Sequence, residues 1–115
     1  MNRPAAKSAT FVGSSLKDLR DFPRSVRREA GFQLDKVQHG EDPADWKPMA
    51  MIGSGACEIR VRDESGAFRL MYVAKFPEAV YVRHAFQKNT QTTATKDLTL
   101  ARARYQEVLA KRKTI

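Results

Sequence analysis

Three strand-like segments follow one another in the middle of the chain, and they constrain the fold more than any other feature. In residues 58–63, apolar residues alternate with charged ones, as in a strand with one buried and one solvent-facing side. Residues 68–76 and 80–87 are rich in β-branched and aromatic residues, which are common in strands. Residues 64–66 and 77–78 leave room only for tight connections. We therefore expect an antiparallel meander.

Helical patterns precede these strands. A short apolar stretch at 11–16 predicts an opening strand that ends at a helix cap, with Ser14 or Ser15 supplying the capping oxygen for a short helix through Phe22. Pro23 suits the first turn of a second helix, and Gly40 is suited to end it. The buried stripe of this second helix is expected to be Val26, Ala30, Leu34 and Val37.

The remaining segments predict a loop and a final helix. Residues 41–56 show no clear periodicity, so we expect a loop held to the body by Trp46 and Met49. After a Thr-rich run, Thr95 or Asp97 can cap a helix. Its expected buried stripe is Leu98, Ala101, Tyr105, Val108 and Leu109, and its C-terminal part is basic through Arg102, Arg104, Lys111, Arg112 and Lys113.

The resulting order, β-α-α-β-β-β-α, predicts an α+β fold in which an antiparallel sheet packs against helices. The length of 115 residues fits one domain. We assign residues 10–115 to that domain and expect residues 1–9 to be a flexible N-terminal tail.

Charge is the outlying property of the composition. Lys and Arg number 21 against 13 Asp and Glu, which gives a net charge of +8 and suggests a polyanionic partner. Many small soluble proteins are basic for solubility alone, so the placement of the charges has to decide.

The sequence lacks the motifs that are typical of several classes of function. We find no phosphate-binding glycine loop and no nucleophile elbow. A single cysteine, Cys57, and two histidines, His39 and His84, make a metal site or thiol catalysis improbable, and no cofactor is expected. No apolar run is long enough for a membrane span or a signal peptide, so we expect a cytoplasmic protein.

The solvent-facing sides of the meander carry cations where any polar residue would be tolerated. These are Arg60 and Arg62 on the first strand, Arg69 and Lys75 on the second, and His84 and Lys88 on the third. Facing cations repel, so such a cluster needs a compensating acid, for which Glu58 is available, or a bound polyanion. The alternative is a set of independent surface arginines paired with Asp63, Glu64 or Glu78.

Taken in order, these segments resemble a known family. The matching motifs are Ser14-Ser15-Leu16-Lys17-Asp18-Leu19, Gly40-Glu41-Asp42-Pro43, Trp46-Lys47-Pro48-Met49, Glu58-Ile59-Arg60-Val61-Arg62, Gly66-Ala67-Phe68-Arg69-Leu70-Met71-Tyr72 and Val80-Tyr81-Val82-Arg83-His84-Ala85-Phe86-Gln87-Lys88. They are similar to the phage-derived branch of the RelE/HigB toxins of type II toxin–antitoxin systems. The resemblance covers nearly the whole chain after Thr10.

The resemblance implies a RelE-like fold and a metal-free endoribonuclease, an mRNA interferase that cuts messages on the ribosome. The catalytic residues it implies are Arg62, Arg69, His84, Lys88 and Glu58, and the RNA-binding residues are Arg60, Lys75 and Thr90. Arg69 matches the phosphate-stabilising arginine and is expected to project from the solvent-facing side of the central strand. Proton transfer is left open between His84 and Glu58, with Lys88 as an acid or an electrostatic partner.

The resemblance also implies partners: messenger RNA, the ribosome, and a cognate antitoxin of the helix-turn-helix, HigA-like type. Two other functions remain open. One is a non-catalytic basic nucleic-acid-binding module, which would need stacking aromatic residues such as Phe68, Tyr72, Tyr81 or Phe86. The other is an interaction protein whose grooves hold a helix of its partner.

Overall fold

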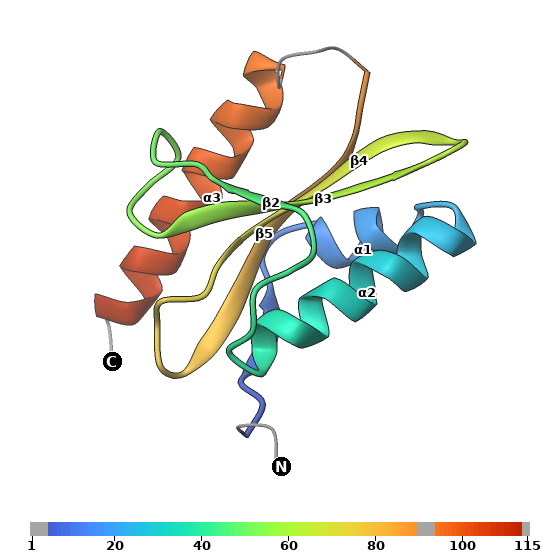
Figure 1. The fold of residues 1–115 in the computed structure, drawn as a ribbon. Helices are drawn as coiled ribbons and strands as arrows, with labels where there is room; N and C mark the ends of the chain where they lie inside the picture. The colour runs from blue at the N-terminus through green and yellow to red at the C-terminus, as the bar shows by residue number, and fades with distance from the viewer. Residues whose placement is uncertain (1–4, 90–93, 114–115) are drawn as a thin grey trace.

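The computed structural model describes residues 5–89 and 94–113 of the chain. Along the sequence the elements are β1 (Ser8–Phe11), α1 (Ser15–Arg20), α2 (Arg24–Gln38), β2 (Trp46–Pro48), β3 (Ala56–Asp63), β4 (Gly66–Val73), β5 (Ala79–Lys88) and α3 (Thr95–Lys113). The strands form one mixed sheet in the order β1-β5-β4-β3-β2 (Figure 1). The predicted α+β class and element order are confirmed, with one additional strand.

The predicted meander is formed by β3, β4 and β5, which pair antiparallel. Gly66 opens β4 with φ +130°, a backbone conformation that suits glycine, and so makes the tight turn after β3. The second strand ends at Val73 and not at 76, which places Lys75 outside the sheet. The Lys7 ammonium donates hydrogen bonds to the carbonyls of Ala74 (2.6 Å) and Phe76 (3.0 Å) just beyond that end.

The N-terminal strand differs from the prediction in place and in direction. β1 starts at Ser8, so Ser8 and Ala9 of the segment expected to be a tail belong to the sheet. β1 pairs parallel with β5, with Ser8 opposite Ala79. This parallel pairing makes the sheet mixed. The sequence pattern did not predict it, because β1 pairs with a segment about seventy residues away.

The segment expected to be a loop, residues 41–56, contains the short strand β2. It pairs antiparallel with β3, and Lys47 lies opposite Glu58. All three residues of β2 are exposed, so the strand has no alternation of buried and exposed positions that the sequence could show. Met49 is buried as expected, whereas Trp46 remains 39% exposed.

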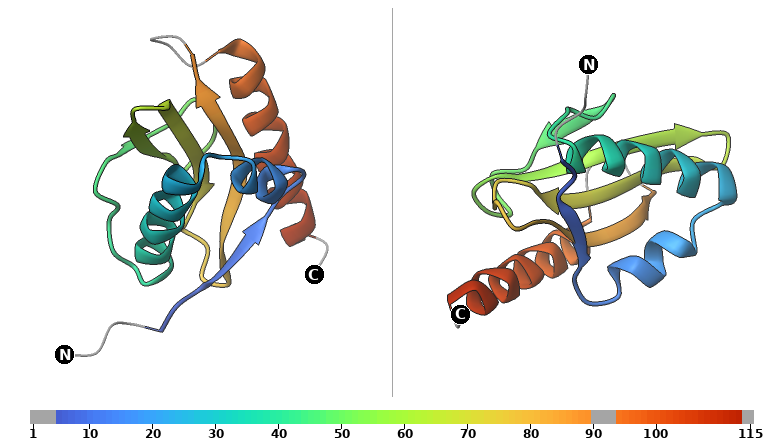
Figure 2. Two further views of the ribbon diagram at one scale, coloured as in Figure 1. Left: turned by 90° about the vertical axis from the view of Figure 1, so that its right-hand side faces the viewer. Right: turned by 90° about the horizontal axis from the view of Figure 1, so that it is seen from below.

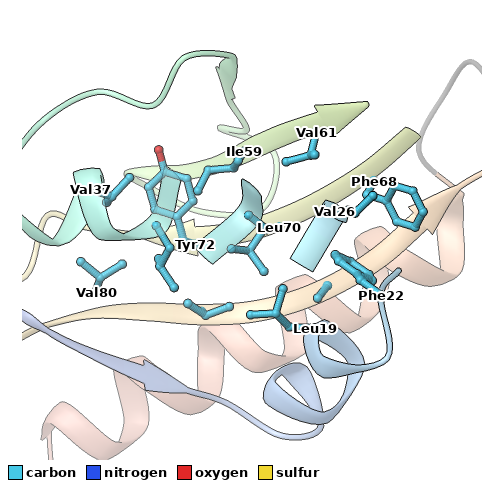
Figure 3. Packing of buried hydrophobic residues seen from close by; sticks show 14 residues of the cluster. Leu19, Phe22, Val26, Val37, Ile59, Val61, Phe68, Leu70, Tyr72 and Val80 are labelled. Carbon is cyan, nitrogen blue, oxygen red and sulfur yellow. The ribbon is translucent and has the colours of Figure 1, made fainter. Parts of the chain in front are cut away.

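Helices α1 and α2 cover one face of the sheet. The predicted stripe of α2 is buried there, against apolar residues of β3, β4 and β5. Figure 3 shows this packing, with the rings of Phe22 and Phe68 close together at a centroid distance of 4.9 Å. Gly40 follows α2 with φ +81°, the conformation expected of a terminating glycine. Ser14 precedes α1, but its hydroxyl donates to the Asp18 carboxylate and caps no backbone N–H.

Helix α3 packs on the opposite face, against β5 and part of β4 (Figure 2). Ala101, Tyr105 and Val108 are buried as predicted, while Leu98 and Leu109 are only partly buried. Arg104, expected on the basic outer side, is instead 8% exposed. Its guanidinium donates to the Arg83 carbonyl (2.8 Å) and to Ser14 Oγ (2.9 Å) and so ties α3 to the sheet.

Arg83 itself is fully buried between β5 and α3. It donates to the carbonyls of Tyr72 and Ala101 and lies over the Tyr105 ring. Burial lowers the pKa of Arg83 to about 10, because the charged form is held away from water. Within the described residues, no helix has both the length and the apolar character needed to cross a membrane.

Candidate functional site

Cross-strand pairing brings most of the predicted cations to one face of the sheet. Arg60 of β3 lies directly opposite Arg69 of β4, and Arg69 lies opposite Phe86 of β5. Two residue pairs further on, Arg62 and Lys88 are both opposite Ala67. Because side chains alternate along a strand, these cations share a face.

β2 adds a cation that the sequence analysis missed. Lys47 lies opposite Glu58, which shares a face of β3 with Arg60. No signal pointed to it, because β2 was expected to be a loop. We call the set Lys47, Arg60, Arg62, Arg69 and Lys88 the cationic face.

Apart from Lys88, beside which α3 begins, the cationic face occupies the end of the sheet that α3 leaves uncovered. The buried contacts of α3 on β4 are with Met71 and Val73, further along the strand from Arg69. In Figure 1 the β3–β4 hairpin extends away from α3. Cations at this end can therefore be reached by a large partner.

Of the predicted RNA-binding residues, Arg60 lies on this face and Lys75 does not. Lys75 lies beyond the other end of β4, roughly 20 Å from Arg69 at about 3.3 Å per residue, and its ammonium lies 5.3 Å from the centre of the Phe76 ring. Thr90 lies outside the described residues.

Arg69 is more deeply placed than the sequence suggested. It was expected to project from the solvent-facing side, but only 5% of it is exposed, since Arg60, Phe86 and neighbouring side chains surround it. Its Nη1 donates to the Phe68 carbonyl (3.0 Å). Burial lowers the pKa of Arg69, and the Glu58 carboxylate opposes that shift.

Glu58 is the acidic residue among these cations. It is 2% exposed, and its Oε1 lies 3.5 Å from Nε of both Arg60 and Arg69. Its predicted role in offsetting like-charge repulsion agrees with this position.

Lys88 is a partly exposed amine on the last strand of the site. Its partial burial lowers the pKa of Lys88, and the positive charge of Arg69 lowers it further. A lysine with a lowered pKa gives up its proton more readily than a free lysine does, which suits it to proton transfer.

His84 lies beside the cationic face but does not open onto solvent. It is 5% exposed, its Nε2 lies 2.7 Å from Asp97 Oδ1 at the start of α3, and its ring stacks on Phe86. Nδ1 is buried and has no hydrogen-bond partner among the described residues. Asp97 was expected only as a helix cap, so its pairing with His84 is a contact that sequence reasoning missed.

A small cavity of about 140 Å³ lies between the end of β5 and the start of α3. Its lining includes Phe86, Lys88 and Asn89 from the strand side and Lys96 and Asp97 from α3. Lys96 thus adds a second lysine beside Lys88, so the concave part of this site is also basic.

No curated protein matches the chain. Solved structures and protein families do, and both agree with this architecture. Among solved structures, a mutant of the E. coli toxin RelE in the free state is similar, with a TM-score of 0.61 and 19% sequence identity over 82% of this chain and 96% of that chain. At that level of identity the likeness shows the fold, which is RelE-like. Residues 17–106 match the family described as "Phage derived protein Gp49-like". Since this match spans more than half of the sequence, the chain belongs to the Gp49-like family of phage-derived proteins, as its motifs predicted.

Proposed function

We propose that the protein is the toxin of a type II toxin–antitoxin system, an endoribonuclease that cleaves messenger RNA on the ribosome and so stops translation. The observation that carries the proposal is the cationic face, where two arginines lie opposite each other at the open end of the sheet. The RelE-like fold and the Gp49-like family support it.

The proposed chemistry is attack by a ribose 2′-hydroxyl on the adjacent phosphorus. The 2′-oxygen forms a bond to phosphorus and loses its proton, the bond from phosphorus to the 5′-oxygen breaks, and the 5′-oxygen takes up a proton. The products are a 2′,3′-cyclic phosphate and a free 5′-hydroxyl. The protein must stabilise the negative charge that develops on the phosphate oxygens.

Arginines suit this task because a guanidinium group offers forked donors that match phosphate oxygens. In the proposed site Arg69 lies at the centre, with Arg60 opposite it and Arg62 two residue pairs away. Arg69 and Arg62 bind the reacting phosphate, and Arg60 holds the neighbouring backbone. Lys47 extends the same surface along the message.

Proton transfer falls mainly to Lys88, a partly exposed amine that lies on the strand beside Arg69. We assign it the role of acid toward the 5′-oxygen, helped by its lowered pKa. Of the other two candidates, Glu58 is held between Arg60 and Arg69, and His84 is paired through Nε2 with Asp97. A ribosome that orients the message supplies much of the rate through positioning, so a water molecule suffices as the weak base that takes up the proton of the 2′-hydroxyl.

The proposed partners follow from the same surface. A cytoplasmic nuclease of this kind must be silenced, and an antitoxin, of the helix-turn-helix, HigA-like type, would cover the cationic face through an acidic segment. Complementary charge gives fast capture.

The alternative of a non-catalytic nucleic-acid-binding module finds less support. It needs aromatic rings exposed for stacking. Phe68, Tyr72 and Phe86 are 2%, 4% and 9% exposed, and all three pack in the two cores. The fourth candidate, Tyr81, is partly buried against the core under α3 and donates a hydrogen bond to Glu78.

Brief expression without the antitoxin tests the proposal. Protein synthesis should stop, and messages should acquire new 5′ ends inside translated regions. Arg62→Ala removes an exposed cation of the site and should weaken the arrest, whereas the matched control Arg28→Ala removes an exposed cation of α2 and should act as the wild type does. Intact messages in cells that contain folded protein would contradict the proposal.

A further inference from the structure

Glu58 occupies an unusual place for an acidic residue. It lies in the middle of β3 and is 2% exposed, on the same face as Arg60 and two residue pairs along the ladder from Arg69. Buried carboxylates are costly unless they are paired. Its neighbours therefore determine what it does.

The contacts of Glu58 are electrostatic and leave hydrogen-bonding capacity unused. One oxygen, Oε1, lies 3.5 Å from Nε of both Arg60 and Arg69. Neither Nε makes a hydrogen bond, and Oε2 has no partner among the described residues. One carboxylate thus attracts two guanidinium groups and accepts a hydrogen bond from neither Nε atom.

The charges of this triad do not cancel. Two guanidinium groups and one carboxylate leave an excess of one positive charge, and Arg69 is largely shielded from water. A phosphodiester carries one negative charge and accepts forked hydrogen bonds. Its arrival would complete the charge balance of the triad.

We propose that Glu58 is a positioning residue that acts as a fixed internal anion, holding Arg60 and Arg69 in place for the phosphodiester and transferring no proton itself. The inference rests on the proposed function in that it names the RNA backbone as the ligand of these two arginines, with the reacting phosphate at Arg69 and the neighbouring phosphodiester at Arg60. A 2′-hydroxyl would have to displace a guanidinium group to reach the buried carboxylate, which separates this role from that of a general base.

Thermal unfolding in inorganic phosphate tests the proposal without RNA. Glu58→Gln keeps the shape of the side chain and removes the internal anion, so the two arginines should bind phosphate at least fivefold more tightly than in the wild type. At phosphate about tenfold above the new Kd, the variant should gain about 5 °C more than the wild type does. Glu107→Gln, on the exposed side of α3, is the control and should respond as the wild type does. Sodium chloride of equal ionic strength corrects for screening.

Equal phosphate responses of Glu58→Gln and the wild type would overturn the proposal. If Glu58→Gln folds only when phosphate is added, the proposal is supported. The double variant Glu58→Gln/Arg60→Gln, which removes the pair of facing like charges, should be more stable than Glu58→Gln alone. A double variant that is less stable, or unfolded like the single one, would overturn the proposal.

The pH dependence of RNA cleavage separates positioning from proton transfer. Residual cleavage by Glu58→Gln should keep the wild-type pH profile with a reduced rate. Loss of the acid limb of that profile would identify Glu58 as the base and overturn the proposal. If the protein cleaves no RNA at all, the proposed function fails, while the phosphate titration still decides the role of Glu58.

Discussion

Arg60 and Arg69 are cross-strand partners on β3 and β4. The Nε atom of each lies 3.5 Å from the same carboxylate oxygen, Oε1 of Glu58. Two like charges placed opposite each other destabilise a sheet. The buried carboxylate offsets part of that cost and leaves the pair with excess positive charge. The arrangement suits a protein that binds phosphate, and it does not fit a set of independent surface arginines.

Binding to single-stranded RNA should weaken steeply as salt rises, because the cationic face releases counterions from phosphates. For four phosphate contacts we expect the logarithm of affinity to fall against the logarithm of salt concentration with a slope of about −3. Arg62→Ala should reduce that slope by about 0.7, and Arg28→Ala should not change it. Fluorescence anisotropy over a salt series measures both. An affinity independent of salt would show that the cations are only solvated.

Replacing Gly13 should loosen the attachment of α3. Gly13 has φ +59°, and a Cβ there would lie 2.6 Å from Nε of Arg104. Gly13→Ala therefore strains the backbone and displaces the guanidinium group that ties α3 to Arg83 and Ser14. We expect a loss of about 1–3 kcal/mol in the free energy of unfolding, measured by urea denaturation.

Gly31→Ala is the matched control for that experiment. Gly31 lies within α2, and no atom lies within 4 Å of its added Cβ. The substitution should stabilise the protein by about 0.5–1 kcal/mol, because alanine favours the helix. Equal effects of the two substitutions would contradict the proposed role of Gly13.

The pair of Glu78 and Arg112 should make stability depend on acid pH. Arg112 donates to Glu78 at 2.6 Å, and this hydrogen bond, with smaller help from the backbone and from Tyr81, lowers the pKa of Glu78 from its ordinary 4.5 to about 2. A lowered folded-state pKa contributes stability above pH 4.5 that is lost as the pH falls toward 2.

Glu78→Gln therefore should be less stable than the wild type at pH 7, with a difference that shrinks between pH 4.5 and pH 2. Urea midpoints of both proteins across that range provide the measurement. Because the pair is exposed, the difference should also shrink at high salt. A difference that stays constant with pH would assign the effect to packing.

The sequence was sufficient where the pattern is local. The alternation in β3, the spacing in α2 and the Gly66 turn each have a short-range cause, and all three elements form as predicted. The pairing of Arg60 with Arg69 also follows from the meander, because a tight turn fixes the register.

The sequence was insufficient where a contact joins distant segments. The parallel pairing of β1 with β5, the exposed strand that presents Lys47, and the contact of His84 with Asp97 leave no periodic trace. The charge of Arg104 predicts an exposed side chain. In the structure it is buried, and the carbonyl of Arg83 and the hydroxyl of Ser14 accept hydrogen bonds from its guanidinium group.

The most direct test of the central claim compares the wild type, Arg69→Ala and Arg69→Lys as purified proteins. The measurement is cleavage of ribosome-bound message, with the new 5′ ends read by sequencing. Arg69→Ala should lower the single-turnover rate about a hundredfold or more, since losing one charge-stabilising donor costs on the order of 3 kcal/mol. Arg69→Lys keeps the charge but not the fork, so it should restore the rate only in part. Near-UV circular dichroism verifies that each variant is folded. Full cleavage by folded Arg69→Ala would contradict the account.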